Sequence, residues 1–178
     1  MDLTMSPKVV FLDRDGVLNA LVERDGKMVS PRLFKDFRIL DGVNDAVAEL
    51  RRQNFVLVVV TNQPDISRGL MMQSELDLMT KEVFALGVHH VFICPHSDED
   101  LCLCRKPKPG LLTQYLDSLD CKPTELWMIG DREVDMQAGT AVGAMTIHIT
   151  SGGQGQSISL KESSAKDLEG AIRRIIDN

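Results

Sequence analysis

Short segments rich in apolar and β-branched residues recur along the chain, and in most of them polar positions do not alternate with apolar ones. Continuous apolar runs are typical of strands that are buried on both faces of a parallel sheet. The pattern therefore predicts five buried strands. They are expected over residues 8–12, 55–60, 90–93, 126–129 and 145–149.

Segments with apolar residues at a helical spacing lie between these strands. In the clearest of them, Val43, Val47 and Leu50 share one face of the expected helix. The repeated alternation of strand and helix predicts an α/β sandwich with a central parallel sheet and right-handed crossovers. The helices are expected over residues 41–53, 74–86, 111–119, 134–141 and 165–176.

Two segments depart from this alternation. Residues 19–40 contain Arg24-Asp25-Gly26 between two short extended stretches, which indicates a hairpin or a loop. Residues 152–164 are rich in glycine and serine, and we expect a mobile loop there. The chain has no low-complexity linker and no internal repeat, so residues 1–178 are expected to form one domain.

The composition narrows the classes of partner. The 178 residues include 20 Lys and Arg against 26 Asp and Glu, a formal charge of −6. This acidic balance argues against nucleic acid or an anionic membrane as the main partner. No apolar run reaches the roughly 18 residues of a membrane-spanning helix, and the start of the chain lacks a signal-peptide pattern. We therefore expect a cytoplasmic protein and, without an evident exposed apolar stripe, a monomer.

Carboxylates and a hydroxyl follow the predicted strands. In open α/β sheets, ligands bind beyond the carboxyl ends of the strands. Asp13 and Asp15 follow the first strand, Thr61 the second and Asp131 the fourth. Neighbouring carboxylates repel each other and favour a cation between them, and oxygen ligands suit Mg²⁺. Turn formation and helix capping are the alternative reading of these aspartates, but three strand ends together favour a Mg²⁺ site.

Four short motifs follow one another along the chain. They are Phe-Leu-Asp-Arg-Asp-Gly-Val-Leu-Asn at 11–19, Thr-Asn-Gln at 61–63, Arg-Lys-Pro-Lys-Pro-Gly at 105–110 and Gly-Asp-Arg-Glu-Val-Asp at 130–135. Together they resemble the motifs of the haloacid dehalogenase superfamily of phosphatases. The resemblance extends from residue 9 to about residue 143, and it is nearest to the small subgroup that acts on heptose bisphosphate and histidinol phosphate. It implies a Rossmann-like three-layer sandwich without a cap domain.

The resemblance also implies catalytic roles. Asp13 would be the nucleophile that forms an aspartyl-phosphate, and Asp15 would be the general acid and base. The Thr61 hydroxyl and the Lys106 ammonium would hold the transferring phosphoryl oxygens.

The same resemblance places Mg²⁺ on Asp13, on the backbone carbonyl of Asp15 and on Asp131. The role of Asp135 stays open. It is either a partner of Lys106 or of the metal waters, or a carboxylate at the N-terminus of the following helix.

Three cysteines and a histidine form a second candidate metal site. Two Cys-x-Cys/His pairs separated by a short loop offer the tetrahedral ligand set of structural zinc. Free buried cysteines or a redox pair are the alternatives. The resembling subgroup carries such a loop directly before the Arg-Lys-Pro motif, which implies a zinc ion that aims Arg105 and Lys106. Acidic residues 98–100 are expected to be solvated, and Cys121 stands apart. The proposed ligands are Cys94, His96, Cys102 and Cys104.

Without a cap, loops must select the substrate. We expect three loops to do so: residues 19–30, residues 61–69 and the zinc-binding loop at residues 94–104. Arginine side chains suit phosphate groups. A surface ion pair is the alternative reading of Arg68. The candidate substrate-binding residues are Asn19, Asn62, Arg68, Arg105 and Arg132.

The predicted function is a Mg²⁺-dependent phosphatase of a small sugar phosphate, with a heptose bisphosphate as the favoured substrate. Pro64 and Asp65 stand where the resembling subgroup has Ser-Gly, which puts this substrate in question. Histidinol phosphate is the alternative substrate, because Asp65 or Glu23 could contact an amine. A zinc-stabilised binding protein is the alternative outside enzymes.

Overall fold

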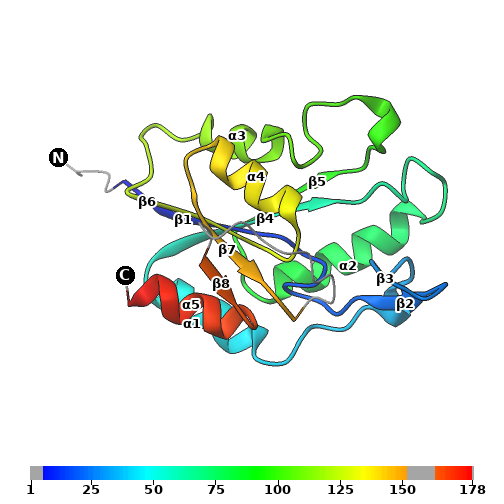
Figure 1. Ribbon diagram of the computed structural model, residues 1–178, viewed down its shortest axis with the longest axis horizontal. Helices are drawn as coiled ribbons and strands as arrows, with labels where there is room; N and C mark the ends of the chain where they lie inside the picture. The colour runs from blue at the N-terminus through cyan, green and yellow to red at the C-terminus, as the bar shows by residue number, and fades with distance from the viewer. Residues whose placement is uncertain (1–5, 152–162, 178) are drawn as a thin grey trace.

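A computed structural model describes residues 6–151 and 163–177. Its centre is a six-stranded parallel sheet with the order β5-β4-β1-β6-β7-β8 (Figure 1). Adjacent residues of the central strand β1 point to opposite faces, and all four from Val9 to Leu12 are buried, which explains its continuous apolar run. The strands are β1 Lys8–Leu12, β4 Phe55–Asn62, β5 His90–Cys94, β6 Glu125–Gly130, β7 Met145–Ile149 and β8 Ser163–Ala165.

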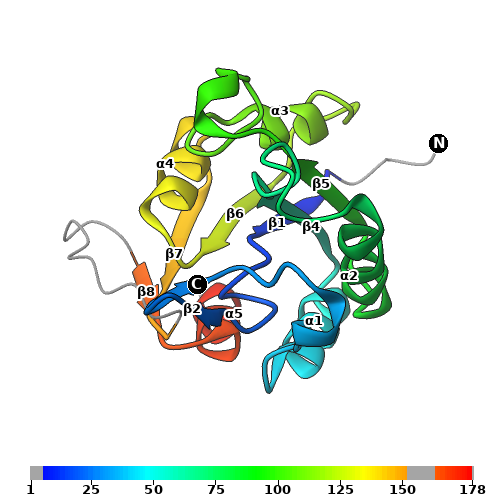
Figure 2. The ribbon, with the colours of Figure 1, turned by 90° about the vertical axis from the view of Figure 1, so that its right-hand side faces the viewer.

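Helices cover both faces of the sheet. Helices α1, α2 and α5 pack on one face with Val10 and Leu12, whereas α3 lies on the other with Val9 and Phe11. Helix α4 joins α3 on that second face, so the molecule has three layers (Figure 2). The helices are α1 Val43–Arg52, α2 Gln73–Ala85, α3 Gly110–Leu116, α4 Glu133–Ala141 and α5 Leu168–Ile176, with short 3-10 turns η1 Phe34–Asp36 and η2 Asp98–Asp100.

The hairpin expected within residues 19–40 is confirmed. Strand β2, Val22–Arg24, pairs antiparallel with β3, Lys27–Val29. Asp25 and Gly26 both have positive φ, 53° and 72°, as a two-residue hairpin loop requires. This hairpin lies between β1 and α1, where it extends past the carboxyl end of the sheet. In the described part of the chain no cap domain accompanies it.

The C-terminal part differs from the prediction. The helix expected from residue 165 begins at Leu168, because Asp167 accepts a hydrogen bond from the backbone N–H of Gly170 and caps it. Residues Ser163–Ala165 instead form β8 beside β7. The mobile loop expected over 152–164 lies outside the described residues except for its last two positions, which belong to β8.

None of the helices in the described ranges is long and apolar enough to cross a bilayer.

Candidate active site

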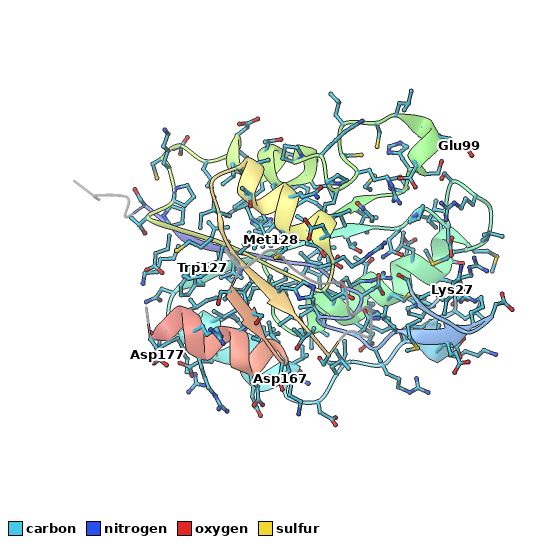
Figure 3. The ribbon with its side chains drawn as sticks, in the orientation of Figure 1. Lys27, Glu99, Trp127, Met128, Asp167 and Asp177 are labelled. Carbon is cyan, nitrogen blue, oxygen red and sulfur yellow. The ribbon has the colours of Figure 1, made fainter. Side chains whose placement is uncertain are left out.

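Seven polar residues are buried together at the carboxyl end of the sheet. They form the floor of a cleft of about 420 Å³. The cleft opens between the β2–β3 hairpin and the loop after β5, and Figure 3 shows Lys27 and Glu99 from these two segments at the same end of the molecule. The floor residues are Asp13, Asp15, Thr61, Gln63, Lys106, Asp131 and Asp135.

Lys106 is the central cation of this floor. Its ammonium Nζ lies 2.8 Å from Asp13 Oδ1 and 2.6 Å from Asp135 Oδ1, and it donates to the Val60 carbonyl at 2.7 Å. Burial lowers the pKa of Lys106, but the two carboxylates outweigh burial and raise it above its usual range. Lys106 therefore stays charged.

Asn62 fixes the backbone of Lys106. Its Oδ1 accepts from the Lys106 N–H at 3.1 Å, and its Nδ2 donates to the Lys106 carbonyl at 3.0 Å. Asn62 lines the cleft, as expected of a substrate-binding residue, but both ends of its amide are engaged by Lys106. In this structure Asn62 positions the lysine.

Three carboxylates gather beside Lys106. The oxygens of Asp13, Asp131 and Asp135 lie within 4.8 Å of one another. Burial, offset partly by Lys106, raises the pKa of Asp13 to about 6. Burial and the charges of Asp13 and Asp135 raise the pKa of Asp131 to about 8. Buried Asp131 Oδ1 has no hydrogen-bond partner among the described residues. Three buried carboxylates that are so close together and so hard to ionise suit a hard divalent cation.

Two neighbours position Asp131. His148 lies 3.0 Å through Nε2 from the Asp131 carbonyl oxygen. Gly16 has a φ of +86°, and a Cβ at this position would collide with the Asp131 carboxylate. The glycine after Asp15 is therefore needed both for its backbone conformation and for its lack of a side chain.

Asp135 combines the two roles that the sequence left open. Its Oδ1 pairs with Lys106, and its Oδ2 accepts from the backbone N–H of Arg132 at the start of α4. One carboxylate thus caps the helix and neutralises the lysine. The sequence prediction did not include Asp135 among the metal-site residues, although the structure places it beside Asp13 and Asp131.

Asp15 faces away from this group. Its carboxylate accepts from Arg14 Nη2 at 3.0 Å, from Asn19 Nδ2 at 3.0 Å and from Gln63 Nε2 at 2.7 Å. Burial raises the pKa of Asp15, but the Arg14 charge and the three donors outweigh burial and lower it. Its side chain is not one of the three clustered carboxylates, so only its backbone carbonyl remains a candidate metal ligand.

The structure corrects the role expected of Asn19 and reveals one for Gln63. Asn19 is fully buried beneath Asp15 and does not line the cleft, so it positions Asp15 and does not contact a substrate. Gln63 Nε2 donates both to Asp15 and, at 2.8 Å, to the Thr61 hydroxyl. Its place in the Thr-Asn-Gln motif was the only sequence signal for this bridge.

Arginines surround the cleft mouth. Arg68, Arg105 and Arg132 all line it, as expected. Arg68 also lies 3.6 Å from Asp65, which is the ion pair of the alternative reading. Arg32 pairs with Asp65 at 2.6 Å. Two arginines therefore offset the negative charge of Asp65, the residue that departs from the motif of the resembling subgroup.

Residues 98–100 are all exposed, as the sequence predicted, and two of them also make local contacts. Asp98 pairs with Arg105 at 2.6 Å. Asp100 accepts from the backbone N–H and the hydroxyl of Ser97 and so closes the η2 turn. The loop therefore holds Arg105 at the cleft.

The cysteine–histidine cluster is assembled as expected. All three cysteines are free thiols. The contacts between its donor atoms range from 3.2 Å for Cys94–Cys104 to 3.7 Å for Cys94–Cys102, and His96 Nδ1 is 3.2 Å from Cys104 Sγ. A tetrahedron with metal–ligand bonds of about 2.0–2.3 Å has edges of about 3.3–3.8 Å. The donor set and its spacing therefore fit a zinc ion.

Comparison with known proteins agrees with this geometry. The sequence profile of HAD-hydrolase-like proteins matches residues 103–171. D-glycero-β-D-manno-heptose-1,7-bisphosphate 7-phosphatase from Haemophilus influenzae is 35% identical in an alignment 171 residues long, and the match covers 85% of this chain and 89% of the relative. The Pseudomonas putida protein of the same name is 32% identical over 82% and 83% of the two chains.

A solved structure shows the same fold. The D,D-heptose 1,7-bisphosphate phosphatase from B. bronchiseptica, complexed with magnesium and phosphate, superposes with a TM-score of 0.82 and is 27% identical. The match covers 96% of this chain and 98% of that one. The chain therefore belongs to the haloacid dehalogenase-like hydrolases, and within them it is a phosphoric monoester hydrolase of the family that contains these heptose-bisphosphate phosphatases.

Proposed function

We propose that the protein hydrolyses D-glycero-D-manno-heptose 1,7-bisphosphate with Mg²⁺, through an aspartyl-phosphate on Asp13. The observation that carries this proposal is the pairing of Lys106 with Asp13 on the floor of an open, arginine-rich cleft. Relatives that share about a third of their residues with this chain carry the name of that activity.

In the first step Asp13 attacks phosphorus. Lys106 engages Oδ1 of Asp13, which leaves Oδ2 as the nucleophilic oxygen. The bond from Oδ2 to phosphorus forms while the bond from phosphorus to the sugar oxygen breaks. Asp15 donates its proton to that departing oxygen. Thr61 and Lys106 balance the charge on the phosphoryl oxygens.

In the second step water releases the phosphate. Asp15, now a carboxylate, accepts a proton from a water molecule whose oxygen attacks phosphorus. The bond between Asp13 and phosphorus breaks, and Asp13 regains its carboxylate. Asp15 is ionised in the free protein, and the negative phosphate beside it raises its pKa on substrate binding, because like charges disfavour ionisation.

The residues suited to hold Mg²⁺ are Asp13, Asp131 and the backbone carbonyl of Asp15. The unpartnered Asp131 Oδ1 supports this assignment. When bound, the ion supplies positive charge that offsets the phosphoryl oxygens and the neighbouring carboxylates. Asp135 stays committed to Lys106 and to the start of α4.

Magnesium is expected to raise the melting temperature more at about pH 8 than at about pH 5. Without metal, folding raises the pKa of Asp131 to about 8, far above its value of about 3.9 in an unfolded chain. The native state then binds more protons, so stability is lost as pH rises through this window. Magnesium binds the ionised carboxylate of Asp131 and so competes with this proton. Magnesium competes best near pH 8, where the carboxyl group loses its proton most easily. Thermal unfolding with and without Mg²⁺ measures the difference.

The matched variant is Asp131→Asn, which should lose most of the magnesium shift at both pH values. An equal magnesium shift at both pH values in the wild type would contradict the proposed site.

The substrate assignment is tested by phosphate release with Mg²⁺ from heptose 1,7-bisphosphate, from histidinol phosphate and from sugar monophosphates. We expect the highest kcat/KM for the heptose bisphosphate. Asp65, the residue most suited to an amine, is already paired with Arg32 and Arg68, which disfavours histidinol phosphate. A higher kcat/KM for histidinol phosphate would overturn the assignment, and an absence of hydrolysis would overturn the activity.

We also propose that the cysteine–histidine cluster binds one structural zinc ion. Purified protein should contain one zinc per chain, and Cys104→Ser should lose it. The variant should also unfold more easily by several kcal/mol, since metal binding contributes directly to folding. Elemental analysis and thermal unfolding measure both effects. Cys121→Ser is the matched control and should keep the metal; a zinc-free wild type that forms a disulfide would favour the redox alternative.

A further inference from the structure

Two basic side chains face each other across the β2–β3 hairpin. Arg24 and Lys27 are directly opposite in the antiparallel register, and both line the cleft above the catalytic floor. Figure 3 shows Lys27 at the end of the molecule where this cleft opens. Like charges at opposite positions of a strand pair destabilise it, and this hairpin has only three residues per strand. The arrangement therefore calls for a negative partner.

Of the four other arginines that line the mouth, three have carboxylate partners, and Arg132 has none among the described residues. Arg32 and Arg68 share Asp65, and Arg105 pairs with Asp98. In contrast, no carboxylate of the described residues lies within 4.0 Å of the charged nitrogens of Arg24 or Lys27.

The acidic neighbours on the hairpin do not fill this role. Glu23 is opposite Met28 in the register, and unlike Arg24 and Lys27 it does not line the cleft. Asp25 is exposed in the turn and makes no salt bridge with Arg24 or Lys27.

We infer that Arg24 and Lys27 form a subsite for a second phosphate group of the substrate. The inference rests on the proposed function and extends it, because the floor around Asp13, Thr61 and Lys106 accounts for one phosphoryl group. The second group, at the far end of the same sugar, meets the hairpin. The arginine can bind phosphate in a bidentate manner, and the lysine adds a point charge. The preferred substrate class is therefore a sugar bisphosphate.

The test compares heptose 1,7-bisphosphate with heptose 7-phosphate, which lacks only the second phosphate. For the wild type we expect a kcat/KM about 10- to 100-fold higher for the bisphosphate, as two charge-assisted contacts to phosphate allow. In the R24Q/K27Q variant this ratio should fall to near one, mainly through a higher KM for the bisphosphate. A variant with the same loss of charge on α5, R173Q/R174Q, should keep the wild-type ratio.

A wild type that does not prefer the bisphosphate, or an R24Q/K27Q variant that keeps the preference, would overturn the subsite while leaving the phosphatase activity in place. A general electrostatic effect would instead lower the ratio in R173Q/R174Q as well, which also overturns it.

Binding measurements on an inactive variant test the subsite without turnover. Calorimetry with the Asp13→Asn protein and Mg²⁺ should show tighter binding of the bisphosphate than of the 7-phosphate, and the added R24Q/K27Q changes should remove that difference. Equal affinities before those changes would refute the subsite even if the wild type hydrolysed neither compound, a result that would by itself refute the proposed function.

Discussion

Asp13→Asn is expected to lower kcat for phosphate release by about 10⁴-fold or more, the scale of losing the nucleophile of a covalent mechanism. A carboxamide cannot form the bond to phosphorus. The fold should survive, because Lys106 keeps Asp135 and the Val60 carbonyl as partners. Steady-state phosphate release and thermal unfolding of the same preparation measure the two effects separately.

The matched control for this variant is Asp120→Asn, which changes an exposed carboxylate in the loop before β6. It should retain wild-type kcat. If Asp13→Asn kept more than about a hundredth of the wild-type rate, measured free of contaminating phosphatase, Asp13 would not be the nucleophile.

Lys106→Met is expected to impair both catalysis and stability. Removing the cation leaves Asp13 and Asp135 buried without their partner, and breaking a buried ion pair from one side costs about 3–5 kcal/mol of unfolding free energy. The rate should fall by about 10²- to 10³-fold, because the charge that balances the phosphoryl oxygens is lost. Denaturant unfolding and steady-state kinetics provide the measurements.

Two comparisons sharpen this prediction. Lys122→Met, at an exposed position, should change neither quantity. The double variant K106M/D135N should recover part of the lost stability, since one stranded carboxylate is gone, but not the lost rate. An unfolding free energy for Lys106→Met within about 1 kcal/mol of the wild type would show that the buried pairs do not hold the floor together.

The strands were predictable where burial on both faces leaves a compositional mark. Val9 and Phe11 face one layer of helices and Val10 and Leu12 face the other, so the four buried positions of β1 are all apolar. Strand β8 leaves no such mark, because Ser163 and Ser164 join the sheet through backbone pairing with β7. Ser163 and Ser164 were therefore assigned to a loop, and Ala165 to the following helix.

The residues of the candidate site were likewise predictable only in part. Asp13, Thr61 and Asp131 were expected together because parallel strands end at one edge of a sheet, and the structure places all three on the cleft floor. Lys106 arrives on a long loop, so only the family resemblance pointed to it. Asn62 holds the backbone of Lys106 through two hydrogen bonds. This role depends on side-chain geometry, which the spacing of residues in a sequence does not reveal.

The corrected role of Asn19 has the same cause. Its position six residues after Asp13 placed it in a motif, but not on a particular side of it. Only the turn at Gly16 and the contact of Asn19 Nδ2 with Asp15 show that it lies beneath the cleft. Motif membership identified the neighbourhood, whereas the direction of each side chain required the fold.

Phosphate is expected to pass through Asp13. The most direct test is rapid acid quenching of the wild-type protein within its first turnover with Mg²⁺ and heptose 1,7-bisphosphate labelled in the phosphate that is removed. We expect a labelled, hydroxylamine-sensitive acyl phosphate on the peptide that contains Asp13, and no such label in the Asp13→Asn variant. Label on another residue, or no covalent label during demonstrable turnover, would contradict the mechanism.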